Sequence, residues 1–560
     1  MNRRSMAALA RITVALLLVG VLLVGCQPPE ADYDLARVAT ARQKVHEIEA
    51  LELEEAETDP NQPPPGDPNV PPPAVLELSL PECRALALEN NLKLKADLIE
   101  PAIAEAGLSA EEAKFESVFY AGINYLRTEQ PFGSVVRIPD SSVFLPVIES
   151  SQRMRISSNL RVDIPLRTGG TVRFNAVDTR NEDLKGDPNF NPSYEDRVSV
   201  SLSQPLLRNA GQWINTHSIR IAAYTRDLVS ARTKLEVITV LAALDRVYWR
   251  LYAARRELEV REQQYELAQA QLDRAQRLVD AGERSQVEVI RAEAGVAQQL
   301  EAIIVAENSL RDRERELKRV LNKSGLTMET PTVVVPMSAP DPVRYDLQRP
   351  RLIRTAMESR MELLQLQLQL LQDSSTVDFA RNQTLPWASL DYTYNISGTG
   401  FTRDDSFDLL TNRDFTDHIV GLQMMVPIGN KAAKNQLRQA IYRRRQRIAT
   451  KESREDLIRL EVLNAADQVE ANWQRILAAR QNAILNSRLY EAEQRQFGIG
   501  ISTSTDVLNA QINFANAQSA EIVALTEYQI SLVDLAYATG TVLGAARVHW
   551  EPIVPVADAD

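Results

Sequence analysis

The chain has 560 residues and a formal net charge of −12. Long stretches dominated by Ala, Leu, Gln, Glu and Arg, with only 21 Gly in the whole chain, are typical of long helices or coiled coils and argue against several ordinary globular domains. The acidic charge is spread along the chain and forms no basic stripe, so nucleic acid is excluded as a predicted partner.

The first predicted element is a bacterial lipoprotein signal peptide over residues 1–25. Three arginines accompany the apolar run Ile12–Val24, which is shorter than the roughly 20 residues that span a bilayer. A small residue, Gly25, precedes Cys26, as in a lipobox, so Cys26 is the predicted site of cleavage and lipidation. A plain membrane anchor with an incidental cysteine is the alternative. Gln27, in place of Asp, favours the outer membrane by resemblance to the enterobacterial sorting rule.

Residues 26–75 are predicted to form an acidic tether behind the lipidated cysteine. The segment contains Pro63–Pro65 and Pro71–Pro73 and cannot bury enough apolar surface to fold. Cys83 follows in the helix-like stretch Leu80–Leu86. We expect it to be a small packed residue rather than a reactive thiol.

Beyond the tether the chain repeats itself. The segment Gly282–Ala292 aligns with Gly500–Ala510, and Ala87–Leu94 resembles Ala356–Leu363. Repetition in the same order predicts two copies of one structural unit. The predicted division is a first repeat, an equatorial linker, a second repeat and a carboxy-terminal tail, at residues 76–325, 326–350, 351–545 and 546–560.

Each copy contains one very long predicted helix. No Pro or Gly lies between Gly211 and Gly282, so the first helix could be about 70 residues and roughly 100 Å long. Its counterpart runs from about Ala432 to Phe497. Helices of this length have to pack against other helices along their length. The residues of the first helix that hold one heptad register are Val237, Leu241, Leu244, Tyr248, Leu251, Leu258, Tyr265, Leu272 and Val279.

Each long helix is expected to reverse at a glycine-containing turn. The turns are Ala281–Gly282 and Gly498–Gly500, and the returning helices are Gln286–Leu321 and Thr505–Ala538. Residues 502–504 (Ser-Thr-Ser) offer N-caps for the second returning helix. The predicted helical hairpins span residues 212–321 and 432–540.

Between the helices the period of the apolar residues changes from about 3.5 to 2. Segments of about 9 to 13 residues with one apolar and one polar face have the length of transmembrane strands. A soluble sandwich with one solvated face is the alternative, but strands that occur only between long helices, behind a signal peptide, favour a barrel. In the first copy the strands are expected at about 119–127, 154–166, 171–180 and 196–206, and in the second within about 387–427.

Taken together, these features resemble the outer membrane efflux (TolC-like) family in its lipidated branch, over nearly all of residues 76–545. The motifs that carry the resemblance are Ala87–Asn91, Leu202–Leu207, Leu385–Pro386, Phe497–Gly500, Asp506–Leu508 and Leu535…Gly540. Pro205 and Pro427 match the prolines that turn the family's chain from barrel to helical tube.

The resemblance implies an internally duplicated α+β membrane protein that forms a homotrimer. Its transmembrane β-barrel, shared by three protomers, is continued by a long periplasmic α-helical barrel of coiled-coil hairpins. Four strands in the first copy depart from the family, which usually has two there. The extra hairpin, which turns at Thr168–Gly170, either widens the barrel or folds outside it.

No catalytic motif was found, and neither an enzyme nor a cofactor is predicted. The four histidines are scattered without metal-site spacing, and two cysteines are too few for a disulfide framework. Acidic clusters such as Arg311–Glu316 alternate with basic residues, which is typical of solvated helix faces.

Asp506 is the candidate gate residue. It matches an acidic position of the family's inner coil, where a trimer would form a carboxylate ring that attracts cations. A helix-start Asp that favours the helix dipole is the alternative. The family often has a second Asp and an Arg nearby, where this chain has Asn509 and Ser502, so the resemblance implies a looser closing latch. The matching position in the first copy is Glu288.

The predicted function is that of an outer-membrane exit duct for solutes, held in outer membrane lipid. The expected partners are a periplasmic adaptor and an inner-membrane transporter of the RND, ABC or MFS class. The alternative is a lipid-anchored structural coiled-coil envelope protein that conducts nothing. The hairpin tips expected to contact the adaptor contain Gly282, Glu283, Glu288, Gly498 and Gly500.

Overall fold

The computed structural model describes residues 74–139, 142, 144–183, 191–283 and 285–549. Residues Pro73–Asp560 form one compact unit. The predicted signal peptide, the lipidation site Cys26 and nearly all of the tether lie outside the described residues. Among the helices of the described part, none is both long and apolar enough to cross a bilayer.

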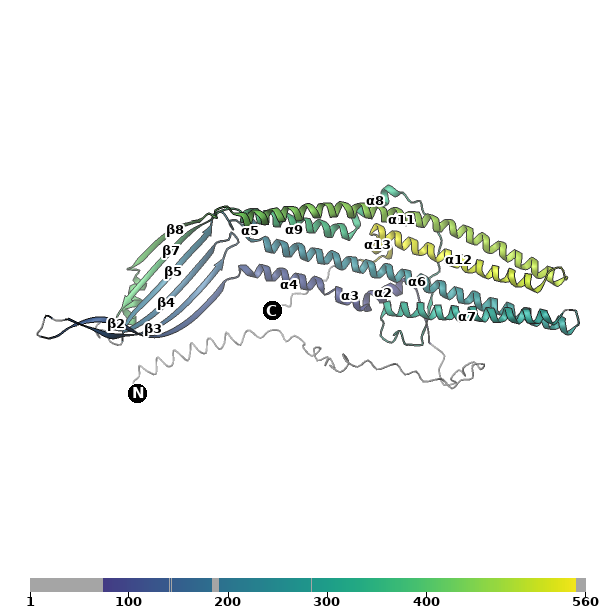
Figure 1. The fold of residues 1–560 in the computed structure, drawn as a ribbon, viewed down its shortest axis with the longest axis horizontal. Coiled ribbons are helices and arrows are strands. Elements are labelled where there is room, and N and C mark those ends of the chain that lie inside the picture. Colours follow the sequence, from purple (N-terminus) through teal and green to yellow (C-terminus); the bar gives the residue numbers. More distant parts are fainter. Residues whose placement is uncertain (1–73, 140–141, 143, 184–190, 284, 550–560) are drawn as a thin grey trace, which may run out of the picture. The chain divides into compact units, whose positions relative to one another are not determined.

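A six-stranded antiparallel sheet forms one part of this unit (Figure 1). Its spatial order is β2-β3-β4-β5-β7-β8, so the extra hairpin, β3–β4, lies inside the sheet between β2 and β5. The strands are β2 (Val118–Arg137), β3 (Phe144–Pro165), β4 (Thr171–Asp183), β5 (Ser193–Pro205), β7 (Trp387–Gly400) and β8 (Thr416–Met425).

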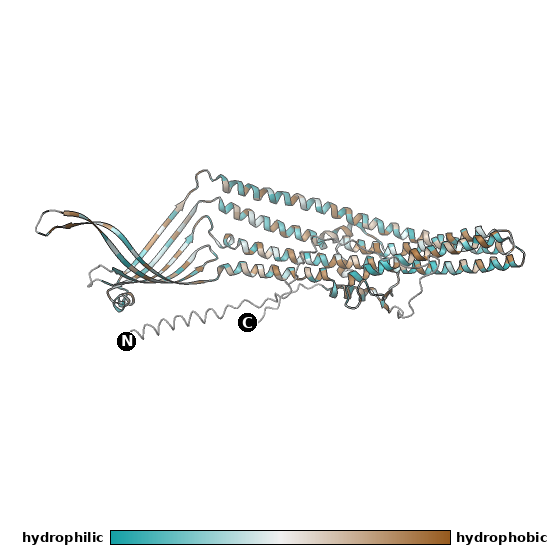
Figure 2. Ribbon diagram, turned by 60° about the horizontal axis from the view of Figure 1, so that its bottom comes forward, coloured by the Kyte–Doolittle hydropathy of each residue, from teal (hydrophilic) through white to brown (hydrophobic). Residues whose placement is uncertain are grey.

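The two faces of the sheet differ in polarity, as Figure 2 shows by the alternating colours along the strands. Residues directly opposite each other in an antiparallel ladder share a face. One cross-strand row is apolar from β2 to β7: Phe119, Val162, Phe174, Val200 and Tyr394. The next row, on the opposite face, is largely polar: Tyr120, Arg161, Asn175, Ser199, Asn395 and Asp417.

The apolar face has little cover within the protomer. Phe119 and Phe174 expose 61% and 45% of their surface, and Val420 and Leu422 on β8 expose 70% and 72%. An uncovered apolar face of this extent needs a lipid or protein environment.

Strands β2 and β3 run beyond the predicted segments 119–127 and 154–166. Pairing of β3 with β4 begins at Arg153, whereas pairing of β2 with β3 continues to Arg137 and Phe144. Residues 129–137 and 144–152 therefore pair only with each other and form the outer ribbon, which extends past the other strands in Figure 1. This extension was not predicted because Pro131 and Gly133 interrupt the alternation of apolar and polar residues.

Two long helical hairpins form the rest of the unit's length. They are α6 (His217–Asp280) with α7 (Gln286–Leu321), and α11 (Lys431–Gly498) with α12 (Ser504–Thr539). Helices α6 and α11 have 64 and 68 residues. The expectation of an unbroken helix from Gly211 was wrong at its start. A short α5 (Gln212–Asn215) comes first, because the Asn215 side chain bonds back to the Asn209 and Gly211 carbonyls instead of supporting the helix.

Shorter elements pack around the middle of the hairpins and at the sheet. A parallel pair of four-residue strands, which the sequence did not reveal, joins the start of the described chain to the linker, and α10 interrupts the strand region predicted at 387–427. These elements are β1 (Val75–Leu78), β6 (Val333–Pro336), α2 (Leu80–Asn90), α3 (Leu92–Asp97), α4 (Glu100–Glu112), η3 (Ala113–Phe115), α8 (Arg349–Ser359), α9 (Met361–Gln383), α10 (Arg403–Asn412) and α13 (Val542–Ala546).

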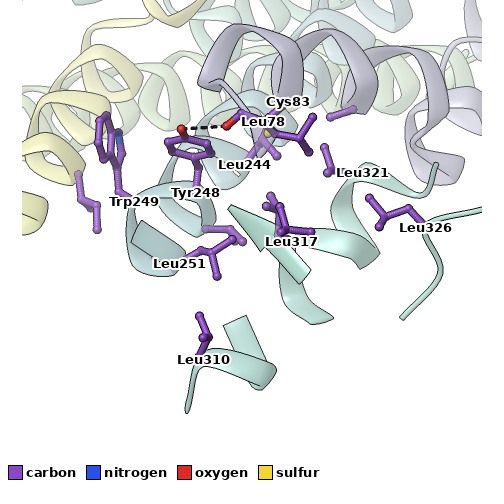
Figure 3. Close-up of a cluster of buried hydrophobic side chains, with 14 residues drawn as sticks. Leu78, Cys83, Leu244, Tyr248, Trp249, Leu251, Leu310, Leu317, Leu321 and Leu326 are labelled. Atoms are coloured by element: carbon purple, nitrogen blue, oxygen red, sulfur yellow. Dashed lines mark hydrogen bonds between the residues drawn. The ribbon is translucent and has the colours of Figure 1, made fainter. Parts of the chain in front are cut away.

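The largest buried cluster lies where α2, β1 and β6 cover α6 and α7 (Figure 3). Leu244, Tyr248 and Leu251 of the predicted heptad register are fully buried there. The Tyr248 hydroxyl donates to the Leu78 carbonyl at 3.2 Å. Cys83 is fully buried in this cluster, which confirms the expectation of a small packed residue. Its burial raises the pKa of the thiol to about 12.

Towards the tip of α6 the predicted register changes. Tyr265 and Leu272 are only half-buried, and the buried positions are instead Gln264, Ala268 and Ala275. A straight helix drifts by about 20° per heptad against a strict seven-residue repeat, so a different row of residues comes to face the neighbouring helices.

Candidate functional site: the tips of the helical hairpins

The turn between α11 and α12 is built by a glycine and a capping box. Gly500 has φ 82°, a conformation that side chains disfavour. Thr503 is the N-cap of α12. Its hydroxyl donates to Asp506 Oδ2 at 2.6 Å, its amide donates to the same oxygen at 3.0 Å, and the Asp506 amide donates to Thr503 Oγ1 at 3.3 Å.

These hydrogen bonds explain the electrostatics of Asp506. The Thr503 hydroxyl, then the Thr503 amide, and finally the Ser502 hydroxyl hold the pKa of the Asp506 carboxyl below its usual value. The carboxylate is exposed and ionised at neutral pH. Asp506 lies in the first turn of α12, where the alternative of a helix-start Asp expected it, and it also completes the capping box. This position is compatible with a charge role, because a capping carboxylate keeps its charge.

Ser502 connects the two helices of this hairpin. Its hydroxyl donates to Glu493 Oε2 of α11 at 2.6 Å and lies 3.5 Å from Asp506 Oδ2. Glu493 was not anticipated, because it lies nine residues before Ser502 and approaches it only through the turn. The side chain at position 502, where the family often has an arginine, thus joins two carboxylates without neutralising them.

Asn509 lies on the same exposed face of α12 as Asp506. The exposed positions follow each other at intervals of three and four residues, which places them on one stripe of the helix. The stripe is polar near the tip and becomes apolar farther along: Asp506, Asn509, Asn513, Asn516, Ala520 and Val523.

The turn between α6 and α7 differs in its chemistry. Gly282 has φ 76°, and Glu283 is exposed. Glu288, in the first turn of α7, forms an ion pair with Arg291 at 2.9 Å, and its side chain is 14% exposed. Among the described residues, no hydrogen bond or ion pair joins Glu288 to Asp506, so the two corresponding positions belong to separate tips.

The two hairpins are nevertheless held together near their tips. The Arg274 guanidinium of α6 lies 5.5 Å from the centre of the Phe497 ring, and a Cβ on Gly498 would lie 3.1 Å from Arg274 Nη2. Farther from the tips, the Gln511 side chain donates to the buried Gln264 carbonyl at 2.9 Å. Gly498 thus leaves room for Arg274, a role that sequence reasoning missed.

The two junction prolines lie where strand pairing stops. Pro205 is the last residue of β5 and pairs with Ser389, and Pro427 follows the end of β8, before α11 begins. A proline suits these places because it fixes φ and removes a ladder donor.

Comparison with solved structures shows the same fold in outer membrane proteins of bacteria. The Campylobacter jejuni CmeC outer membrane channel matches with a TM-score of 0.58 and 16% identity, over 82% of this chain and 85% of that one. The Vibrio cholerae outer membrane protein VceC matches with a TM-score of 0.57 and 13% identity, over 82% and 96%. The Neisseria gonorrhoeae MtrE outer membrane channel, in its open state, matches with a TM-score of 0.56 and 15% identity, over 83% and 89%.

Sequence comparison identifies the family. None of the curated proteins matches the chain. The family model described as outer membrane efflux protein matches residues 157–323 and 352–541, one stretch in each predicted repeat and together more than half of the chain. The chain therefore belongs to the outer membrane efflux protein family, as its resemblance to TolC-like proteins predicted.

Proposed function

We propose that three copies of the chain form a passive exit duct through the outer membrane. An inner-membrane transporter of the RND, ABC or MFS class would drive export, and a periplasmic adaptor would connect the transporter to the duct. Membership of a family of channel proteins, rather than enzymes, supports this proposal.

The observation that carries the proposal is the sheet with one uncovered apolar face and two open edges. In lipid every backbone polar group needs a partner, so an open six-stranded sheet cannot stand there alone. Closure with further copies satisfies the edges at β2 and β8. The polar face then lines the lumen, and the attached helical hairpins continue the duct.

The tips provide two further parts of the proposed machine. The adaptor would contact Gly282, Glu283, Gly498 and Gly500, which are exposed in the protomer. Glu288, tied to Arg291, would contribute less. Asp506, with Asn509 and Ser502 beside it, would form the periplasmic gate, where three copies of the carboxylate ring the axis.

The competing function is a lipid-anchored structural coiled coil without channel activity. Exposed apolar residues along all six strands disfavour it, because a solvated sandwich face would be polar. Heat-resistant trimers in SDS and single-channel conductance of the purified protein in planar bilayers test the proposal. A monodisperse protein that stays soluble without detergent and never conducts would contradict it.

A further inference from the structure

We infer that β3 and β4 are wall strands of the membrane barrel, so that three copies close one barrel of eighteen strands. In it, β2 of each copy pairs with β8 of the next. This inference rests on the proposed trimer and goes beyond it by specifying the wall, the joining edges and the width of the outer opening.

The first argument is the position of the extra hairpin. Strand β2 reaches β5 only through β3 and β4, which are paired continuously with their neighbours. A hairpin folded outside the barrel would leave β2 beside β5, which is not the observed order. The extra strands therefore cannot be removed from the wall without breaking the sheet in two.

The second argument is that both faces of the sheet pass through β3 and β4 without interruption. On the apolar face, Val162 and Phe174 continue the row from Phe119 to Val200. If β3 and β4 lay in water, apolar side chains aligned with those of the lipid-facing neighbours would not be expected on them.

On the polar face, side chains join the same strands. Arg173 Nε of β4 donates to Asp163 Oδ1 of β3 at 2.6 Å. Asn181 of β4 accepts from Arg155 of β3 at 2.7 Å and donates to Glu195 of β5 at 3.2 Å. The polar side chains of the extra strands thus form one network with those of β5.

The third argument is the tight turn between β3 and β4, which is hydrogen-bonded to the junction between β5 and α5. Gln204 accepts a hydrogen bond from the Thr168 hydroxyl at 2.9 Å, and the Gly211 amide donates to the Thr168 carbonyl at 3.0 Å. Gly169 has φ 91°, and a Cβ there would lie 2.4 Å from the Asn209 carbonyl oxygen. The turn fits the junction so closely that only glycine is accommodated.

The fourth argument concerns the two free edges. Strand β8 has 10 residues, Thr416–Met425. The part of β2 that lies beside the body of the sheet is Val118–Thr128, opposite Arg153–Asp163. These two edges have nearly the same length, which suits pairing of β2 in one copy with β8 in the next. The outer ribbon would not take part in this pairing.

Barrel diameter grows roughly linearly with strand number, and barrels of 16–18 strands leave an aqueous channel. Without β3 and β4, three copies would supply twelve strands. A barrel of eighteen strands would be about one and a half times as wide as that. The outer opening would then not limit the size of the cargo, and selection would fall to the helical tips.

Cysteine accessibility in the full-length trimer, reconstituted into liposomes on a Cys83→Ala background, tests the wall assignment. Phe174→Cys and Asn175→Cys probe the two faces of β4, and Val200→Cys and Ser201→Cys are the matched pair on β5. A charged methanethiosulfonate reagent should modify each polar-face cysteine at least tenfold faster than its apolar-face partner. Lipid-borne nitroxides should quench a fluorophore only at Phe174→Cys and Val200→Cys.

Equal reaction of both β4 cysteines with the charged reagent, beside a normal β5 pair, would overturn the inference and leave the exit duct intact. Absence of trimers and of conductance in the unsubstituted protein would instead contradict the proposed function. A cryo-electron microscopy map of the trimer in nanodiscs counts the strands directly. Eighteen are expected, and twelve with three detached hairpins would refute the proposed wall.

Discussion

The Ser502 hydroxyl donates a 2.6 Å hydrogen bond to Glu493 Oε2 across the turn that joins α11 to α12. With Asp506 Oδ2 at 3.5 Å from the same hydroxyl, two carboxylates of each chain meet at one buried serine. Within the described residues, neither carboxylate forms an ion pair with an arginine or lysine. A trimer would bring three copies of this acidic pair to its periplasmic end.

The first prediction concerns the charge of Asp506. Asp506→Asn keeps an oxygen that can accept from the Thr503 amide but removes the negative charge, so cation selectivity should fall and block by a trivalent cation should weaken. Reversal potentials under a salt gradient measure the selectivity. Thr503→Ala is the matched control: it removes the cap, at a cost of about 1 kcal/mol of helix stability, and keeps the charge. If Thr503→Ala reduces selectivity as much as Asp506→Asn, Asp506 acts only as a cap.

The second prediction concerns pH, measured on Glu493→Gln channels so that Asp506 is observed alone. Hydrogen bonds from Thr503 and Ser502 lower the pKa of Asp506, so the group stays ionised to a lower pH than an ordinary aspartate, whose pKa is about 3.9. Cation selectivity should therefore be constant from neutral pH to about pH 4 and decline at lower pH. The folding stability changes in the same direction. A carboxyl group whose pKa is lowered by folding stabilises the folded state at a pH above its ordinary pKa, and this contribution is lost as the pH falls. A decline already near pH 6 would contradict this assignment.

The third prediction concerns Asn509, one turn along the exposed stripe from Asp506. Asn509→Asp should raise cation selectivity and strengthen trivalent block, because it adds a second carboxylate to the same face of α12. Asn513→Asp, one further turn away, should have a smaller effect. Equal effects at both positions would show that the narrowest point does not lie at the tip.

The fourth prediction concerns the packed seam of α6. Leu251 is fully buried in the cluster of Figure 3. Leu251→Asp places an unpaired charge in an apolar core, at a cost of several kcal/mol, on the order of a buried polar group without a partner. The yield of heat-resistant trimer should fall strongly, whereas Leu251→Met should cost less than about 1.5 kcal/mol and leave it nearly unchanged. A normal trimer with Leu251→Asp would mean that this face is solvated.

The fifth prediction concerns the amino-terminal anchor. Cys26→Ala should abolish fatty-acid labelling and leave the signal peptide uncleaved by the lipoprotein peptidase. Transport should continue, because the barrel itself would hold the trimer in the membrane. Labelling that persists in Cys26→Ala would show that another residue carries the lipid.

The long elements could be predicted from the sequence because their signals are repeated many times. Stretches without proline or glycine and a heptad register indicated α6 and α11, and alternation indicated the strands. Short elements lack such redundancy. Strands β1 and β6 have four residues each and depend on a pairing between Val75 and Val333 that is remote in sequence. One local feature indicates helix α10: Thr402, the N-cap whose side chain accepts a hydrogen bond from the Asp405 amide. The helix was still not predicted, because it lies between two strands.

The candidate site was predictable only in part, for a similar reason. Asp506 and Ser502 could be proposed because their positions match a family pattern. Glu493 and Arg274 were missed because each acts across a turn or between hairpins, where no sequence spacing predicts the distance. The outcome for the heptad register is intermediate: Leu244 is buried as expected, and Tyr265 is not, because helical drift accumulates over several heptads.

The outer ribbon has a practical consequence for work on living cells. It continues β2 and β3 at the end of the sheet farthest from the two long helical hairpins, so with the hairpins in the periplasm it would project from the cell surface. Antibodies and externally added proteases would meet the chain there first, far from the tips of the helical hairpins. An epitope tag inserted between Arg137 and Phe144 should therefore be detected by antibodies on intact bacteria.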